Sequence, residues 1–347
     1  MSNAPLPPTV VDEADLEELL ARPTAADIAF ARTLADDVLV LGAGGKMGPS
    51  LARRIRRAFA AAGTKRRVRA ASRFSDGAVA DALEKDGIDA VSCDLLEPDQ
   101  LARLPEAGHV VYLAGRKFGS EDRPDLTWAH NVVVPALVAR RFAASRIVVF
   151  STGNVYAPVG PASSGSTEAD APAPAGEYAQ SCLGRERVFE YFSRERGTRC
   201  VLFRLFYAVD LRYGTLVDVA RAVFAGAPVD LAVGRVNAIW QGDANSYAFR
   251  SLGLCGSPPR PLVVTGPEVV SVRAAAERFA SSFGRPARLE GVEGPAALLG
   301  NPAACMARLG PPEVSLERLL AWTADWVARG GSSLDKPTHF EATDGRF

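Results

Sequence analysis

Apolar and polar positions follow two alternating patterns along most of the chain. Between residues 37 and 207, short apolar runs such as DVLVLG, HVVYLAG and RIVVFST are separated by segments in which apolar residues recur every three or four positions. Continuous apolar runs indicate strands buried on both faces, and the intervening spacing indicates amphipathic helices. This alternation predicts an α/β fold: a Rossmann-type, doubly wound parallel sheet over residues 37–207.

The flanking segments have different patterns. Residues 1–36 carry helical spacing in two stretches divided by Pro23, which predicts an N-terminal helical extension. Residues 208–330 mix helical spacing with short apolar runs, so we expect a smaller, mixed α/β substrate-side region interleaved with the Rossmann domain. Residues 331–347 form a polar C-terminal tail.

Composition narrows the class of protein. The 347 residues carry 40 Lys and Arg against 40 Asp and Glu, a neutral balance that disfavours a nucleic-acid partner. Five scattered cysteines and three isolated histidines predict neither a disulfide framework nor a metal site. The first residues lack a signal-peptide pattern, and no apolar run approaches the roughly 18 residues that span a bilayer. We therefore expect a cytoplasmic protein without a membrane partner.

The turn after the first apolar strand carries the strongest chemical signal. Gly42, Gly45 and Gly48 have G-x-x-G-x-x-G spacing and lie between that strand and an amphipathic helix. Glycine lets the backbone turn tightly and approach a pyrophosphate, whose charge is met by N–H groups at the helix N-terminus. The expected dinucleotide-binding residues in this turn are Gly42, Gly45, Lys46, Met47 and Gly48.

The end of the second strand bears on which dinucleotide is bound. An acidic residue at this place would hydrogen-bond the ribose 2′-hydroxyl of NAD, whereas this chain has Ser72 and Arg73. A cation suits a 2′-phosphate, so NADP is favoured over NAD, with Lys46 as a candidate for a second phosphate contact.

Taken together, these residues resemble the extended short-chain dehydrogenases/reductases, the NAD(P)-dependent epimerase/dehydratase family, over about residues 37–330. Further matching positions are Asp94, Leu95, Leu113, Ala114, Gly115, Asn131, Thr152 and Tyr178. The resemblance implies that the first six of these border the cofactor, that Thr152 hydrogen-bonds a substrate oxygen and that Tyr178 exchanges a proton with it. It also implies a homodimer through the helices near 127–143 and 177–193.

One position departs from the family pattern: Cys182 stands where the Tyr-x-x-x-Lys motif has its lysine. A neutral thiol cannot supply the positive charge that stabilises a tyrosinate at Tyr178. We favour Lys117, just after the fourth strand, as the compensating catalytic cation. Two other candidates are Arg185, on the same helix face but with its reach directed away from Tyr178, and Arg116, whose side chain diverges from that of its neighbour.

The substrate side is less distinctive. The stretch RLFYAVDLRYG replaces the Arg-Pro-x-Asn-x-Tyr-Gly-Pro stretch of sugar-nucleotide members, which disfavours a nucleotide-sugar substrate. Trp240 and Gln241 either contact a hydroxylated ligand or belong to a polar turn packed on the sheet. The expected substrate-binding residues are Asn154, Arg204, Trp240 and Gln241.

The sequence thus predicts an NAD(P)-dependent oxidoreductase or epimerase. Its substrate is expected to be a small, polyhydroxylated or keto, carbohydrate-like molecule, with hydride transfer and Tyr178 as the acid/base. The alternative is a redox-inactive dinucleotide-binding sensor or partner-binding protein that has lost the lysine.

Overall fold

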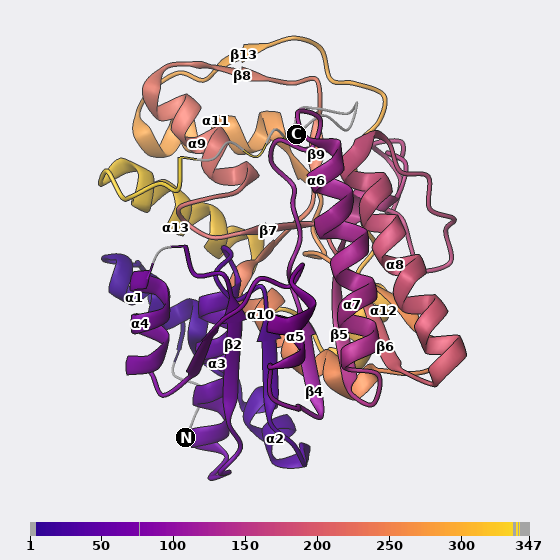
Figure 1. Cartoon of the computed structure of the whole chain (residues 1–347). Helices are drawn as coiled ribbons and strands as arrows, with labels where there is room; N and C mark the ends of the chain where they lie inside the picture. Colours follow the sequence, from indigo (N-terminus) through magenta and orange to yellow (C-terminus); the bar gives the residue numbers. More distant parts are fainter. Residues whose placement is uncertain (1–4, 76, 336–337, 339, 341–347) are drawn as a thin grey trace.

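The computed structural model describes residues 5–75, 77–335, 338 and 340, and within them a parallel sheet of seven strands forms the centre (Figure 1). The strand order is β11-β6-β5-β4-β1-β2-β3. The strands are β1 (Val38–Leu41), β2 (Val68–Ser72), β3 (Asp89–Ser92), β4 (His109–Tyr112), β5 (Arg146–Thr152), β6 (Arg199–Leu205) and β11 (Arg260–Val264). The predicted α/β, Rossmann-type fold is confirmed.

The strand order fixes where a ligand can bind. From β1 the chain runs outward to β3 and then returns to place β4 on the other side of β1. In open parallel sheets, ligands bind at the carboxyl ends of the strands, at the point where the order reverses. This point lies between β1 and β4.

Helices cover both faces of the sheet because alternate strand residues point to opposite sides. Val38 and Val40 of β1 share one core with α3, whereas Leu39 and Leu41 share another with α7 and α8. On the first face lie α2 (Ala25–Thr33), α3 (Gly48–Ala61), α4 (Gly77–Lys85), α10 (Gln241–Arg250) and α12 (Ala303–Leu309). On the second lie α5 (Pro98–Ala102), α7 (Val134–Arg141) and α8 (Gly176–Arg196).

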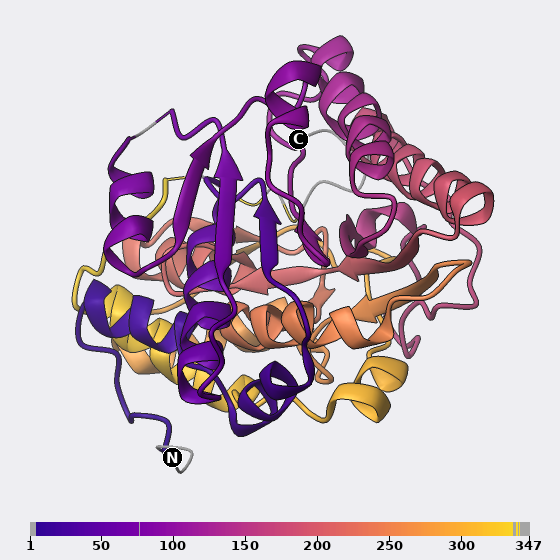
Figure 2. The same cartoon turned by 60° about the horizontal axis from the view of Figure 1, so that its bottom comes forward.

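The helix expected near 127–143 is divided into three parts. It consists of α6 (Pro124–Trp128), a π-helical turn at Ala129–Val133, and α7. Helices α6, α7 and α8 lie side by side at one edge of the molecule in both views (Figures 1 and 2).

A second region lies beyond the carboxyl ends of the strands (Figure 1). Its helices are α1 (Glu13–Ala21), α9 (Thr215–Ala225), α11 (Val272–Phe283) and α13 (Leu316–Ala328), which share a separate hydrophobic core. Its short strands are β7 (Tyr207–Val209), β8 (Pro228–Asp230), β9 (Arg235–Val236), β10 (Ala238–Trp240), β12 (Val270–Ser271) and β13 (Arg288–Glu290). Between these elements the chain returns to the main sheet through α10 and β11.

The N-terminal helices are anchored by a buried ion pair. Pro23 separates α1 from α2, and the side chains of Asp12 and Thr24 cap the two helices. Asp27 of α2 is fully buried and pairs with Arg54 of α3 at 2.8 Å.

Among the described helices, none is long and apolar enough to cross a lipid bilayer.

Candidate active site

Two cavities meet at the carboxyl edge of the sheet, at the reversal point between β1 and β4. One has a volume of about 320 Å³ and is lined by Tyr178, and the other has a volume of about 390 Å³ and is lined by Arg73. We call them the Tyr178 cavity and the Arg73 cavity. They share the lining residues Gly42, Gly45, Leu113 and Gly115. An elongated ligand can therefore pass from one cavity to the other across the glycine turn.

The glycine turn requires glycine at two positions, because a side chain would not fit there. Gly42 has a φ of +84°, and a Cβ there would lie 2.5 Å from the backbone nitrogen of Ala114. A Cβ at Gly48 would clash with the carbonyl group of Ala43. Backbone N–H groups and the start of α3 consequently face a narrow cradle, the arrangement that receives a pyrophosphate in dinucleotide-binding folds.

The Arg73 cavity is formed by the ends of three neighbouring strands. It is lined by Ser72 and Arg73 after β2, Asp94 and Leu95 after β3, and Leu113 and Ala114 after β4. His130, from the π-helical turn, also lines the cavity, and burial together with the positive charge of Arg73 lowers the pKa of this imidazole. Arg73 is exposed at the cavity, where its guanidinium is available to a ligand.

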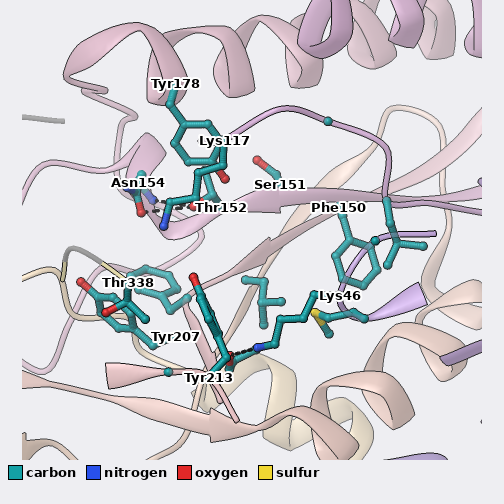
Figure 3. A pocket seen from close by; sticks show the side chains of 18 of the residues that line it. Lys46, Lys117, Phe150, Ser151, Thr152, Asn154, Tyr178, Tyr207, Tyr213 and Thr338 are labelled. Atoms are coloured by element: carbon teal, nitrogen blue, oxygen red, sulfur yellow. Dashed lines mark hydrogen bonds between the residues drawn. The ribbon is translucent and has the colours of Figure 1, made fainter. Parts of the chain in front are cut away.

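The Tyr178 cavity brings together the polar residues expected at the reacting end. Thr152 ends β5, Tyr178 lies in the first turn of α8, and Asn154 follows β5. The Thr152 hydroxyl donates to Oδ1 of Asn154 and accepts from the Asn154 N–H, both at 3.2 Å, and it also hydrogen-bonds the Tyr178 side chain. These residues and Lys117 occupy one wall of the cavity, opposite Lys46 and Tyr213 (Figure 3).

The surroundings of Tyr178 keep its phenol protonated. Burial raises the pKa of Tyr178 far above its usual range, and the neighbouring Cys182 adds to this effect. Arg185 and the hydrogen bond with Thr152 act in the opposite direction. Burial also raises the pKa of the Cys182 thiol, so both groups are neutral at pH 7. Tyr178 is therefore poised as a proton donor.

Two lysines give the Tyr178 cavity a positive character. Burial lowers the pKa of Lys117 to about 8, and its Nζ lies 6.0 Å from the centre of the Tyr178 ring. Lys46 donates to the carbonyl of Ala208 at 3.0 Å and lies 4.1 Å from the centre of the Tyr213 ring. Lys46 is exposed to solvent, yet desolvation by the protein packed around it lowers its pKa to about 8. No Asp or Glu is among the described lining residues, so the cavity favours an anionic or electron-rich ligand.

Arg185 reaches the same cavity, which corrects the expectation that its side chain is directed away from Tyr178. Helix side chains lean toward the helix N-terminus, so a residue two turns after Tyr178 extends back toward it. Its guanidinium donates to the carbonyl of Phe150 and to Oδ1 of Asn131, each at 2.7 Å. Arg116 also lines the cavity and donates to the carbonyl of Gly119.

Three of the expected substrate-binding residues lie outside both cavities. Arg204 is buried and pairs with Glu186 at 2.6 Å. Trp240 packs against Trp322, and Gln241 donates to Ser50 at 3.2 Å in the interior. Their polar atoms or rings are thus used within the fold, and for Trp240 and Gln241 this is the arrangement that the alternative of a polar turn packed on the sheet describes. Asn131 is also buried and supports the site through Arg116 and Arg185.

Several lining residues were not singled out from the sequence. They are Phe150, Phe206, Tyr207, Tyr213, Leu298 and Thr338. The aromatic residues of RLFYAVDLRYG were a signal, because three of the tyrosine and phenylalanine positions in that stretch line the Tyr178 cavity. No group of three or more metal-ligating His, Cys, Asp or Glu side chains occurs among the described residues.

The model of the NAD dependent epimerase/dehydratase family matches residues 38–210. Among curated proteins, none matches the chain.

Solved structures agree on the fold. Pal from Bacillus thuringiensis is 17% identical, with a TM-score of 0.70 over 84% of this chain and 99% of that one. UDP-glucuronic acid 4-epimerase from Bacillus cereus, in complex with NAD, is 17% identical, with a TM-score of 0.69 over 84% and 99% of the two chains. UDP-glucose 4-epimerase from Thermus thermophilus, also with NAD, is 19% identical, with a TM-score of 0.66 over 83% and 98%.

Proposed function

We propose that the protein is an NAD(P)-dependent oxidoreductase or epimerase in which Tyr178 is the acid/base, and the match of residues 38–210 to the model of the NAD dependent epimerase/dehydratase family supports this proposal. The observation that carries the proposal is the hydrogen-bonded pair of Tyr178 and Thr152, which faces a cavity continuous with the glycine turn. A proton donor beside a dinucleotide cradle is the arrangement needed for coupled proton and hydride exchange at a carbon–oxygen bond.

The chain's own residues fit a dinucleotide. The turn of Gly42, Gly45 and Gly48 leaves room for a pyrophosphate, since Cβ atoms at the first and last of these would meet backbone. At the Arg73 cavity, Ser72 and Arg73 stand at the end of β2, where an acidic residue would hold the ribose 2′-hydroxyl of NAD. We therefore propose NADP over NAD as the preferred cofactor. When bound, the nicotinamide supplies the hydride acceptor for oxidation and the hydride donor for reduction.

Tyr178 moves the proton that accompanies this exchange. The neutral phenol donates its proton to a carbonyl oxygen of the substrate as that oxygen becomes a hydroxyl, and the tyrosinate removes it in the reverse direction. Thr152 and Asn154 hold the same oxygen through their side chains. Lys117 takes the part of the missing lysine, since an ammonium with a pKa of about 8 is charged at pH 7 and lies 6.0 Å from the Tyr178 ring centre.

We propose a small polyhydroxylated or keto compound as the substrate. The Tyr178 cavity, of about 320 Å³, also has to admit the reacting end of the cofactor, so the remaining space suits a molecule the size of one sugar unit. Asn154, Tyr213 and Thr338 offer hydrogen bonds, while Phe206 and Leu298 offer apolar surface. The solved relatives that act on UDP-sugars support the carbohydrate-like part of this proposal.

The experiment that tests the function has two parts. Calorimetric titration with NADPH and NADH is expected to show binding of both and tighter binding of NADPH. A screen of sugars, polyols and keto-sugars with the preferred cofactor is then repeated with Tyr178→Phe, which is expected to lose at least about 100-fold in kcat. The matched control is Tyr191→Phe, on the same helix but 59% exposed, which is expected to keep full turnover. Unchanged turnover in Y178F would remove the acid/base role.

The second candidate function is a redox-inactive dinucleotide sensor. Its support is the neutral, buried Cys182 in the place of the lysine, beside a phenol whose pKa is raised by burial. Tight NADPH binding without turnover of any compound in the screen would favour this function over the enzymatic one.

We also propose a homodimer through the helices near 127–143 and 177–193, which comprise the end of α6, the π-helical turn, α7 and α8. Trp128, Val133 and Tyr191 are exposed on these elements, which lie side by side at the edge of the molecule (Figure 2). Light scattering after size-exclusion chromatography is expected to give twice the mass of 36.7 kDa. A purely monomeric profile would contradict the proposal.

A further inference from the structure

Arg185 is a buried cation without a carboxylate partner in the part of the chain that the structure describes. Its side chain is 5% exposed, and its two hydrogen bonds go to neutral oxygens, the carbonyl of Phe150 and Oδ1 of Asn131. Its Nε has no hydrogen-bond partner among the described residues. The other deeply buried guanidinium groups differ, since Arg54 pairs with Asp27 and Arg204 pairs with Glu186.

Such a group is costly for the fold, because a buried charge needs a partner or strong hydrogen bonds to offset its lost hydration. A guanidinium has five N–H donors, of which two are used here. The remaining donors indicate a ligand that brings acceptor oxygens to Arg185.

The position of the guanidinium indicates which part of a bound ligand Arg185 would contact. A Cβ at Gly115 would clash with Nη2 of Arg185 and would lie 2.9 Å from Oδ1 of Asn131. Nη2 therefore lies against the backbone of Gly115, a residue that lines both cavities, and Arg185 itself lines the Tyr178 cavity. The guanidinium thus stands at the junction that an elongated ligand crosses on its way to Tyr178.

The side chain is held in place before any ligand arrives. Asn131 accepts from the backbone N–H of Arg116 and donates to the carbonyl of Arg116 and to the hydroxyl of Ser181, each at 2.9 Å. Because Asn131 is fixed by these bonds, it fixes Arg185 in turn, and little side-chain entropy remains to be lost on binding.

We propose that Arg185 binds the hydroxyl oxygens of the ribose on the nicotinamide side of the cofactor. This inference rests on the proposed function, since it requires a dinucleotide whose adenosine lies in the Arg73 cavity and whose pyrophosphate lies on the glycine turn. The next group toward Tyr178 is then the second ribose, and its hydroxyl oxygens are acceptors for the unused donors of Arg185. In this chain Arg185 would hold the cofactor, while Lys117 acts on Tyr178.

The test compares two nucleotides that differ only in the second ribose. ADP lacks it and ADP-ribose carries it, so the ratio of their dissociation constants isolates contacts to that sugar. Calorimetric titrations use the full chain as wild type, Arg185→Gln and Arg187→Gln. The last is the control, because Arg187 lies on the same helix with its guanidinium paired to Glu190 on the exposed surface.

We expect R185Q to bind ADP-ribose roughly 10- to 100-fold more weakly than the wild type, the usual effect of hydrogen bonds to a charged group. ADP affinity is expected to change by less than about threefold in R185Q, and R187Q is expected to match the wild type with both nucleotides. Retained ADP binding shows in the same experiment that R185Q is folded.

Three outcomes would overturn the inference. These are an equal loss for ADP and ADP-ribose in R185Q, no loss for either, and a wild type that binds ADP-ribose no better than ADP. If R185Q does not fold, Arg185→Lys is measured in the same way. A loss of affinity for ADP-ribose alone would then support the inference. An equal loss of affinity for both nucleotides, or no loss, would overturn it. A wild type that binds neither nucleotide contradicts the cofactor assignment as well. A selective loss in R185Q together with unchanged turnover in Y178F would uphold Arg185 and remove only the acid/base role.

Discussion

The side-chain nitrogen of Lys117 lies 6.0 Å from the centre of the Tyr178 ring, although the two residues are 61 positions apart and come from the loop after β4 and the start of α8. Burial acts on them in opposite directions, lowering the pKa of Lys117 to about 8 and raising the pKa of Tyr178. At pH 7 the pair is an ammonium beside a neutral phenol. A cation at this range stabilises a tyrosinate by roughly 2 to 3 kcal/mol at an effective dielectric of about 20.

The first prediction concerns Lys117→Gln. Without the ammonium, the tyrosinate needed for oxidation is less stable, so kcat is expected to fall by about 30- to 100-fold with a smaller change in KM. The measurement is steady-state turnover of the substrate found in the screen. Lys85→Gln removes an exposed lysine at the end of α4 and is the matched control. Turnover in K117Q equal to that of K85Q would exclude Lys117 from catalysis.

The pH profile gives a second check on the same residue. The pKa of Lys117 is about 8, so its charge is present below that pH and is lost above it. Oxidation by the wild type is expected to decline above about pH 8, and Lys117→Arg, which stays charged, is expected to move this decline to higher pH. The measurement is the profile of kcat between pH 6 and 10 for the wild type and for K117R. Coincident profiles would assign the decline to another group.

Restoring the family motif with Cys182→Lys is expected to harm the protein. Cys182 is fully buried, and its side chain hydrogen-bonds Tyr178 one turn before Arg185. A longer side chain there overpacks the interior, and its ammonium would face the Arg185 guanidinium. We expect a loss of about 2 to 4 kcal/mol in the free energy of unfolding, measured by urea denaturation. Cys182→Ala adds no charge and is expected to lose about 1 kcal/mol while keeping its turnover.

A stable C182K with higher turnover would give the opposite conclusion. It would mean that the site lacks an ammonium at the family position, and that neither Lys117 nor Arg185 replaces it.

Most of the central sheet could be predicted because its strands are buried on both faces and therefore appear as continuous apolar runs. Strand β1 is VLVL, with all four residues buried, and its place in the order follows from the usual winding of such sheets. Strand β11 was expected in the substrate-side region, but it pairs with β6 in the main sheet. Local periodicity indicates a strand and does not say which distant strand becomes its neighbour.

The residues of the site likewise fall into those that the sequence could locate and those that only the fold brings together. Gly42, Thr152 and Tyr178 could be located from spacing, because short motifs fix their place at strand ends and helix starts. Tyr213 and Thr338 reach the Tyr178 cavity from segments far along the chain, so only the fold brings them together. For Trp240, the residue type suggested a place in a polar pocket. Nothing in the sequence indicated that Trp322 contacts it in the interior.

The close approach of Gly115 to Arg185 leads to a prediction for Gly115→Ala. The added methyl group would clash with Nη2 of Arg185, so the guanidinium must move away from the junction of the cavities. NADPH affinity is expected to fall about tenfold or more, measured by calorimetry. Gly77→Ala is the matched control, since a Cβ there meets nothing within 4 Å. Unchanged NADPH affinity in G115A would show that the junction tolerates displacement of Arg185.

The last prediction concerns stability and pH at Asp243 in α10. Burial raises the pKa of this carboxyl from its usual 3.8 to about 6, although it accepts backbone N–H bonds from Glu313 at 3.1 Å and Val314 at 3.0 Å. A folded-state pKa above the unfolded one gives stability that is complete below about pH 4 and is lost as pH rises through 6. A rise of about two pKa units corresponds to roughly 3 kcal/mol.

Asp243→Asn removes this titration, so the free energy of unfolding of the wild type relative to D243N is expected to fall by about 2 to 3 kcal/mol between pH 4 and pH 7. Urea denaturation at a series of pH values measures the difference, and Asp99→Asn, which removes a carboxyl at an exposed position, is the control. The comparison with D243N cancels the titration of all other carboxyl groups. A difference that stays flat for D243N would mean that the backbone N–H groups of Glu313 and Val314 stabilise the carboxylate as much as burial penalises it, and one that grows with pH would mean that they stabilise it more.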